Sequence, residues 1–246
     1  DDSISRYNSL FSFLFEVKQV QLALQRAWRP LRDRAAVGLR SRQQEDAKQR
    51  AKMLTVWALR HKMQFLVDNL QYYLQVDVLD VEHSNLERKI KNATGYEEVT
   101  RAHQVYLATL AERCFLHARV IHRAFRHVFE LSTDFCNLVT MQGAGPLRSD
   151  DLRKVSSLGR EFALQSSFLF LMLDQTIQKT NSPHLQQLIL RIDFNRSYSK
   201  DSLGTTTSGS GSGPSAPAAT AATAAAATAS SSNNNIGGFG ARAQVC

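Results

Sequence analysis

Apolar residues recur every three or four positions along most of the first 200 residues, which is the spacing of one face of a helix. The first such stripe runs through Tyr7, Leu10, Phe11, Leu14, Val17, Gln21, Leu24 and Trp28, with Gln21 as its single polar member. Similar runs cover about 53–77, 97–116, 118–141 and 149–179, and a turn region is expected before Lys91. The runs 97–116 and 118–141 are either two helices or one. No segment alternates strictly as a half-buried strand does, so the pattern predicts an all-α bundle of long helices.

Local signals define several helix ends. Glu97 and Glu98 follow Gly95 as an acidic helix start. Ser149 or Asp150 is suited to the N-cap of the 149–179 helix. A short last helix is expected to begin at Pro183, with Ser182 as its N-cap.

The segment HKMQFLVDNLQYYLQVDVLDVE, from His61 to Glu82, contains no glycine or proline and unusually many amides. At 100° per residue its apolar face and its polar strip are opposed. The apolar face holds Leu59, Met63, Leu66, Leu70, Tyr73 and Leu74; the polar strip holds Gln64, Asp68, Gln71 and Gln75; and a flank beside the strip holds Phe65, Tyr72, Val76 and Leu79. We expect a central helix with a thin polar seam left over. Asn69 and Asp77 fall within the apolar arc and need hydrogen-bond partners there.

Two segments depart from this pattern in composition. From Gly204 onward the chain is mostly Thr, Ser, Gly, Ala and Asn, which cannot bury enough apolar area to order itself. Residues 30–52 lose the apolar period, and Arg26 to Lys52 holds nine Lys or Arg against three Asp or Glu, a net +6 in a chain of +8. We therefore predict a helical domain at 1–203 with a flexible basic insert at 30–52, followed by a disordered tail at 204–246.

Cysteine usage and hydropathy indicate the compartment. Cys114, Cys136 and Cys246 are widely spaced and form no CxxC pair, which favours a reducing cytosolic environment. The longest apolar patch, FLFLML from Phe168 to Leu173, is far shorter than the roughly 18 residues of a membrane span. This shortness predicts a soluble protein without a membrane partner. The opening residues DDSIS do not resemble a secretory signal.

Catalytic and metal motifs are missing from the sequence. It has no Gly-rich phosphate loop after a strand, no HExxH and no nucleophile motif. DVEH, from Asp80 to His83, is a single approximation to a motif that a di-iron bundle needs twice. We expect no enzyme activity and no cofactor or metal, and we expect His103 to be a core histidine bonded to a backbone group or a carboxylate.

Four segments in order resemble the gamma-tubulin complex protein family. MQFLVDNLQYYLQVDVLDVE resembles the family's signature at Met63, Phe65, Asn69, Leu70, Gln71, Tyr72, Tyr73 and Val78. An earlier helix agrees at Lys18, Val20, Gln21 and Trp28, a later one at Ala102, His103, Tyr106 and Leu107, and LILRIDFNRSY from Leu188 to Tyr198 resembles the closing segment. VDNLQYYLQVDVLD and RIDFNRSY resemble one member in particular. The resemblance spans about residues 4–198.

The resemblance implies that the chain is the family's helical C-terminal domain, which binds gamma-tubulin, and not the N-terminal domain, which makes lateral contacts. It also implies that the sequence starts within the C-terminal domain, after the first part of that domain. It implies a non-enzymatic scaffold for microtubule nucleation, located in the cytoplasm, the cytoskeleton, the centrosome or other microtubule-organising centres, and the spindle. The expected partners are gamma-tubulin and, through parts largely outside this chain, other gamma-tubulin complex proteins.

Three groups of residues are candidate contacts for gamma-tubulin. They are the flank residues Phe65, Tyr72 and Gln75, the outer face Arg119, Arg123 and Arg126 of a helix that buries Ile121, Phe125, Val128 and Phe135, and the closing residues Arg191, Asp193 and Asn195. The competing interpretations are core packing with a solvated edge for the flank, and a solvated charged face for the arginines. The basic 30–52 segment is either a plain insert or an aid to capturing an acidic partner. A basic nucleic-acid-binding or general helical interaction module remains the alternative function, although no nucleic-acid-binding motif is present.

Overall fold

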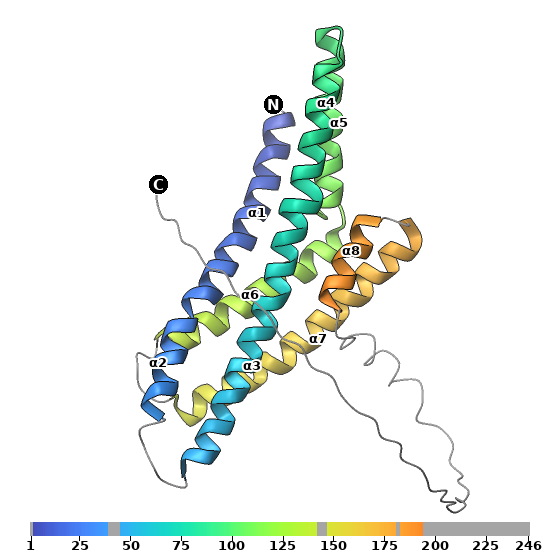
Figure 1. Cartoon of the computed structure of the whole chain (residues 1–246). Helices are drawn as coiled ribbons and strands as arrows, with labels where there is room; N and C mark the ends of the chain where they lie inside the picture. Colours follow the sequence, from blue (N-terminus) through green and yellow to red (C-terminus); the bar gives the residue numbers. More distant parts are fainter. Residues whose placement is uncertain (1, 39–44, 142–146, 181–182, 194–246) are drawn as a thin grey trace, which may run out of the picture. The chain divides into compact units, whose positions relative to one another are not determined.

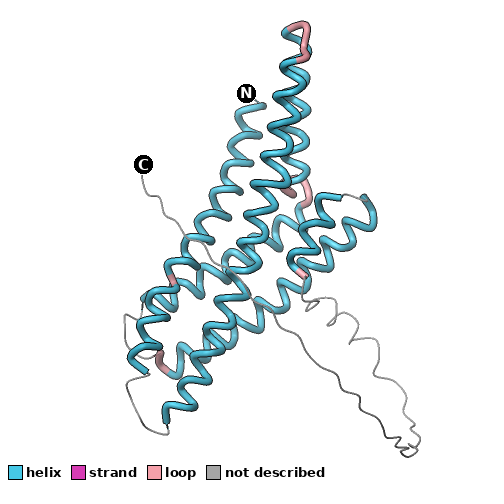
Figure 2. The backbone as a smooth tube through the Cα atoms, in the orientation of Figure 1, coloured by secondary structure: helices cyan, strands magenta, loops and turns pink. Residues whose placement is uncertain are grey.

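Helices account for nearly all of the residues that the computed structural model describes, which are 2–38, 45–141, 147–180 and 183–193 (Figure 2). In chain order they are α1 (Asp2–Arg26), α2 (Trp28–Gly38), α3 (Glu45–Tyr72), the π-helical segment η1 (Tyr73–Asp80), α4 (Val81–Lys91), α5 (Tyr96–Arg113), α6 (Arg119–Met141), α7 (Ser149–Thr180) and α8 (Pro183–Ile192). No strand occurs in these ranges, and the all-α prediction is confirmed. The described helices belong to one unit, Asp1–Thr207. The predicted tail from Gly204 and the N-cap Ser182 lie outside the described residues.

The central element is one continuous rod formed by α3, η1 and α4, from Glu45 to Lys91 (Figure 1). The expected end near Asp77 is wrong, because no glycine or proline interrupts the helical hydrogen bonding before Asn92. The rod contacts α1, α2, α7 and α8 along α3, while α4 pairs with α5. Its predicted apolar face is confirmed as core: Leu59, Met63, Leu66, Leu70, Tyr73 and Leu74 are all buried.

The polar strip of the rod bonds to α1 at Asp68, whereas Gln75 at the far end of the strip is exposed. Gln21 of α1 donates to Asp68 Oδ1 at 2.7 Å, and Gln64 donates to the same oxygen at 2.7 Å. Arg60 Nε donates to the backbone oxygen of Leu24 at 2.9 Å. Gln21 therefore donates across the two packed helices and Gln64 donates from within α3, so the partly buried carboxylate of Asp68 has two donors.

The expected buried stripe of α1 is partly wrong. The residues that α1 and the following turn bury are Leu10, Phe13, Val17, Val20, Leu24 and Ala27. Tyr7, Phe11 and Trp28 are exposed, Phe11 by 67%. Because α1 is apolar on most sides near Phe11, two stripes with helical spacing fit the sequence equally well. Contacts with α3, α5 and α6 select the stripe through Phe13.

The basic segment 30–52 is helical over most of its length, so the predicted insert is wrong at residues 30–38 and 45–52. Pro30 is the third residue of α2. The N–H groups of the first four residues of a helix have no acceptor within the helix, so the missing N–H of a proline costs no helical hydrogen bond there. Leu31 is fully buried, and Arg34 is 5% exposed and donates to the backbone oxygen of Val139 in α6 at 2.8 Å. These two side chains hold α2 against the bundle. Residues 39–44 lie outside the described part.

His103 is also placed differently from the expectation. It is half-buried, and its Nε2 shares a 2.8 Å hydrogen bond with the hydroxyl of Tyr7, which ties α5 to α1. A phenol therefore takes the place expected for a backbone group or a carboxylate. Asn69 finds the partner its position requires, because its amide donates to the backbone oxygen of Phe65 at 2.7 Å.

A tight turn separates α5 from α6, so the two predicted runs are two helices. Leu116 N–H donates to the oxygen of Ala111 and Phe115 N–H to that of Glu112, both at 3.0 Å, the bonding of a Schellman C-cap. Phe115 takes the left-handed position, with φ 60°, that glycine usually occupies. Its ring is 3% exposed and packs against Tyr73 and Phe125 at centroid distances of 5.9 and 5.4 Å. Aromatic packing thus stabilises Phe115 in a left-handed backbone conformation that is unfavourable for a residue other than glycine.

Substitutions at Phe115 separate the stabilisation from the buried ring from the cost of the left-handed backbone. Phe115→Ala removes the buried ring and keeps the left-handed strain, so we expect a loss of about 3–5 kcal/mol in the free energy of unfolding. Phe115→Gly loses the same ring without the strain, so it should be about 1 kcal/mol more stable than Phe115→Ala. Urea unfolding measures both. An alanine variant more stable than the glycine variant would contradict the left-handed assignment.

Candidate partner-binding surface

The signature segment exposes one of its two adjacent tyrosines and buries the other. Tyr73 is fully buried, and its hydroxyl donates to the backbone oxygen of Arg113 at 3.0 Å. Burial raises the pKa of Tyr73, so its hydroxyl remains a donor. Tyr72 is 50% exposed. One tyrosine therefore fastens the rod inside the bundle while its neighbour presents a ring at the surface.

Arg191 of α8 holds the Tyr72 ring in place. Its guanidinium carbon lies 4.3 Å from the ring centroid, a cation–π geometry. The same guanidinium pairs with Asp77 through both terminal nitrogens, and the Nη2–Oδ1 distance is 3.3 Å. The side chains of Arg191 and Asp77 are 29% and 18% exposed. Asp77 thus has the partner that its place in the apolar arc requires. We call Tyr72, Asp77 and Arg191 the Tyr72 junction.

The π-helical backbone of η1 creates this junction. Residues five apart lie about 140° from each other on an α-helix, but i→i+5 hydrogen bonding brings such residues onto one side. Gln75 shows this directly, because its amide donates to Asp80, five residues on, at 3.2 Å. Tyr72 and Asp77 are also five apart, and both reach Arg191. Short π-helical stretches recur at functional sites, so the surface around Tyr72 is a candidate site.

The predicted contact residues fall into separate places. Phe65 is half-buried two turns before Tyr72 on the same side of α3, and Gln75 is exposed. The structure confirms the predicted placement on α6: Ile121, Phe125, Val128 and Phe135 are buried, and Arg119, Arg123 and Arg126 are exposed. Asp193 is half-buried just after α8, and Asn195 lies outside the described residues. The structure therefore unites Tyr72 with Arg191, whereas the arginines of α6 form a separate group.

Arg126 differs from the other two arginines because it faces a neighbour. Its Nε lies 3.6 Å from Glu16 of α1, and both side chains border a groove beside the α5–α6 turn. Sequence reasoning missed this groove. Its signal was present in Ser5, Ser9 and Ser12, which share one face of α1 by their spacing of four and three.

The described residues offer little for covalent or metal chemistry. Burial raises the pKa of both Cys114 and Cys136 to about 12, so neither supplies a thiolate near neutral pH. Within these ranges no three His, Cys, Asp or Glu side chains are grouped to hold a metal ion. Each helix of the described residues is too short or too polar to cross a membrane.

The chain belongs to the gamma-tubulin complex component family, because the family model described as gamma tubulin complex component C-terminal matches residues 1–198. Gamma-tubulin complex component 4 of Mus musculus is 35% identical over 197 residues, covering 80% of this chain and 28% of the relative. The Homo sapiens component 4 gives the same figures. Gamma-tubulin complex component 6 of Homo sapiens is 26% identical over 203 residues, 79% of this chain and 11% of the relative.

These matches confirm the resemblance stated from the signature segment. The member that VDNLQYYLQVDVLD and RIDFNRSY indicate is component 4, and that prediction is confirmed as well. The chain spans about 28% of the length of these two component 4 relatives.

The two adjacent tyrosines provide a matched test of the surface. Tyr73→Ala should lower the free energy of unfolding by about 3–5 kcal/mol, because it empties a buried site. Tyr72→Ala should cost roughly 1 kcal/mol, since half of the side chain is in water and the cation–π contact is small. Thermal and urea melts of the two variants measure the difference. Equal losses would show that Tyr72 belongs to the core and remove it from the candidate contacts.

Proposed function

We propose that this chain is a non-enzymatic scaffold that binds gamma-tubulin and supports microtubule nucleation as part of a gamma-tubulin ring complex. The match of residues 1–198 to the family's C-terminal model carries the proposal, because it covers every described helix. Nucleotide chemistry on this proposal belongs to the partner. The chain acts at microtubule-organising centres such as the centrosome and at the spindle, in line with relatives that include spindle pole body component 98 of Dictyostelium discoideum.

The Tyr72 junction is the contact surface that the geometry supports best. An exposed aromatic ring held by an arginine combines two residue types enriched among the strongest contributors to protein interfaces. Because Arg191 restrains the ring before any partner arrives, little side-chain entropy remains to be lost on binding. Gln75 borders the junction as an exposed polar group, and Phe65 extends the same side along α3. Other gamma-tubulin complex proteins are further partners, through parts largely outside this chain.

Nucleic-acid binding is the weaker candidate. The overall basic character of the chain is its support, but most of the net +8 comes from Arg26 to Lys52, and Arg34 from this stretch is buried and donates to the backbone oxygen of Val139. Leu31 and Arg34 hold α2 against α6. A cationic side chain that is buried in the bundle is not available to bind a phosphate of a nucleic acid.

Co-purification with gamma-tubulin tests the proposed function. We expect the full chain to retain purified gamma-tubulin and to show little salt-sensitive retention on RNA or DNA. Retention of nucleic acid together with failure to bind gamma-tubulin would overturn the proposal.

The contact surface needs its own measurement. Tyr72→Ala should weaken gamma-tubulin binding by at least about 1 kcal/mol, roughly fivefold or more in the dissociation constant, while the melting behaviour changes little. Tyr96→Ala is the matched control, because Tyr96 is 83% exposed at the start of α5 and belongs to none of the candidate contacts. Equal weakening by the two variants would place the contact elsewhere.

A further inference from the structure

A surface groove of about 360 Å³ lies between α4 and α5, which run side by side as a helical hairpin (Figure 1). Its volume is at the small end of the range of ligand sites. The polar and apolar side chains that matter below are Arg88, Lys89 and Asn92 on the α4 side and Glu98, Arg101 and Val105 on the α5 side. The three α5 residues share one face of that helix, because they are three and seven positions apart.

This α4–α5 groove has an excess of positive charge. Three cationic side chains line it against a single carboxylate, that of Glu98. Within the described part of the chain, the side chains of Lys89 and Arg101 form no hydrogen bond or ion pair. Arg88 Nη2 donates to Asn85 Oδ1 at 3.2 Å, and this neutral acceptor leaves the charge of Arg88 unbalanced. Two positive charges therefore remain in excess.

The carboxylates of the hairpin do not cancel this excess. Glu98 Oε2 accepts the backbone N–H of Thr94 at 2.9 Å, which holds that carboxylate at the start of α5. Glu87 is paired with Lys91 at 3.7 Å, and neither of them lines the groove. Glu97 is exposed and also lies outside the lining. Among the lining residues, only Glu98 reduces the attraction for an anion.

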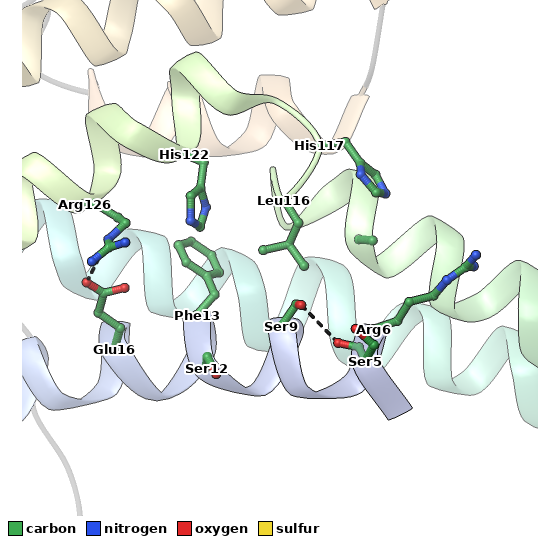
Figure 3. A pocket seen from close by; sticks show the side chains of 11 residues that line it. Ser5, Arg6, Ser9, Ser12, Phe13, Glu16, Leu116, His117, His122 and Arg126 are labelled. Atoms are coloured by element: carbon green, nitrogen blue, oxygen red, sulfur yellow. Dashed lines mark hydrogen bonds and ion pairs between the residues drawn. The ribbon is translucent and has the colours of Figure 1, made fainter. Parts of the chain in front are cut away.

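The larger groove beside the α5–α6 turn differs, because its polar side chains bond to their neighbours (Figure 3). Arg126 Nε lies 3.6 Å from Glu16, and the Ser9 hydroxyl donates to the backbone oxygen of Ser5 at 3.0 Å. An anion that bound Arg126 would have to compete with Glu16. An anion in the α4–α5 groove has no described side chain to displace from Lys89 or Arg101.

Helix-end electrostatics explains only part of the α4–α5 groove. Cations stabilise the C-terminus of a helix, which accounts for Arg88 and Lys89 in the last turn of α4. Arg101 lies in the second turn of α5, near the end at which a helix favours acidic residues. Glu97 and Glu98 precede it by four and three residues, but neither of these described side chains forms an ion pair with it. Arg101 is therefore a cation of the groove that the helix ends do not explain.

We propose that the α4–α5 groove binds a phosphoserine or phosphothreonine side chain of a partner protein. A phosphate monoester carries nearly two negative charges at pH 7 and three acceptor oxygens, which matches the excess charge and the three cationic donors. The guanidinium groups of Arg88 and Arg101 supply forked N–H donors suited to phosphate, and Lys89 adds a point charge. Val105, which is 46% exposed, provides an apolar contact for the residue beside the phosphorylated one.

Other anions match the groove less well. A carboxylate carries one negative charge and two oxygens, so it leaves part of the excess charge unbalanced. A nucleic acid brings a continuous row of phosphates, and Glu87 and Glu97 on the same hairpin repel such a polyanion beside the groove. The site goes beyond the proposed function, because it lies on α4 and α5 and uses no residue of the Tyr72 junction.

A labelled pentapeptide, Ala-Val-pSer-Val-Ala, is the probe for the proposal, with Ala-Val-Ser-Val-Ala and Ala-Val-Glu-Val-Ala as its matches. Fluorescence anisotropy with the full chain should show saturable binding of the phosphopeptide and at least about tenfold weaker binding of the other two. Arg101→Gln should weaken phosphopeptide binding about fivefold or more, and Lys89→Gln/Arg101→Gln should weaken it further. Lys91→Gln is the matched control, because it removes one positive charge from the last turn of α4 without touching the groove lining.

Three results would overturn the proposal: no saturable binding of the phosphopeptide, equal binding of the phosphorylated and unphosphorylated peptides, or equal weakening by Arg101→Gln and Lys91→Gln. Equal binding of the glutamate peptide would reassign the groove to acidic segments and also overturn it. Inorganic phosphate that binds as tightly as the phosphopeptide would show an adventitious ion only, and tighter binding of a single-stranded oligonucleotide would reassign the groove to nucleic acid. Melting curves verify that each variant is folded. Gamma-tubulin is absent from the assay, so its result is independent of the co-purification result.

Discussion

Burial of Tyr73 is the interaction on which the arrangement of the bundle depends. Its ring packs against Phe115 of the α5–α6 turn at 5.9 Å and against His184 of α8 at 6.3 Å, and its hydroxyl bonds to the backbone of Arg113 at the end of α5. One side chain of η1 thus joins three other parts of the chain. The same packing holds Phe115 in its left-handed conformation. It also fixes the direction in which Tyr72, the preceding residue, must point.

The central rod shows how far sequence patterning reaches. The face through Met63, Leu66 and Leu70 could be predicted because 3.6-residue periodicity and burial agree over several turns. The Tyr72 junction could not be predicted, since an ideal α-helix places Tyr72 and Asp77 about 140° apart. Only the π-helical backbone brings both to Arg191, and side-chain periodicity carries no sign of that change. The predicted need of Asp77 for a partner was nevertheless sound, because it followed from burial alone.

The errors in α1 and α2 have a different origin. Both helices have local patterns that fit two structures, and tertiary contacts decide between them. Phe11 and Phe13 have equal claims to the core by composition, and packing against α3, α5 and α6 buries Phe13. The charge of residues 30–52 indicated a flexible segment, but Leu31 and Arg34 each reach the interior once α2 lies against α6. Neither contact can be predicted from the pattern of a single helix, because each depends on a neighbouring helix.

Asp68 has a consequence for how α1 is aligned along α3. One oxygen of this carboxylate accepts both the amide of Gln21 and that of Gln64. An apolar stripe alone tolerates sliding, because a shift by one turn replaces one aliphatic contact with another of similar size. A shift of one turn here would carry Gln21 about 5.4 Å along the axis and leave a half-buried charge short of a donor. The hydrogen bond from Gln21 to Asp68 therefore fixes the axial register of α1 along α3, and with it the axial position of the exposed α1 side chains.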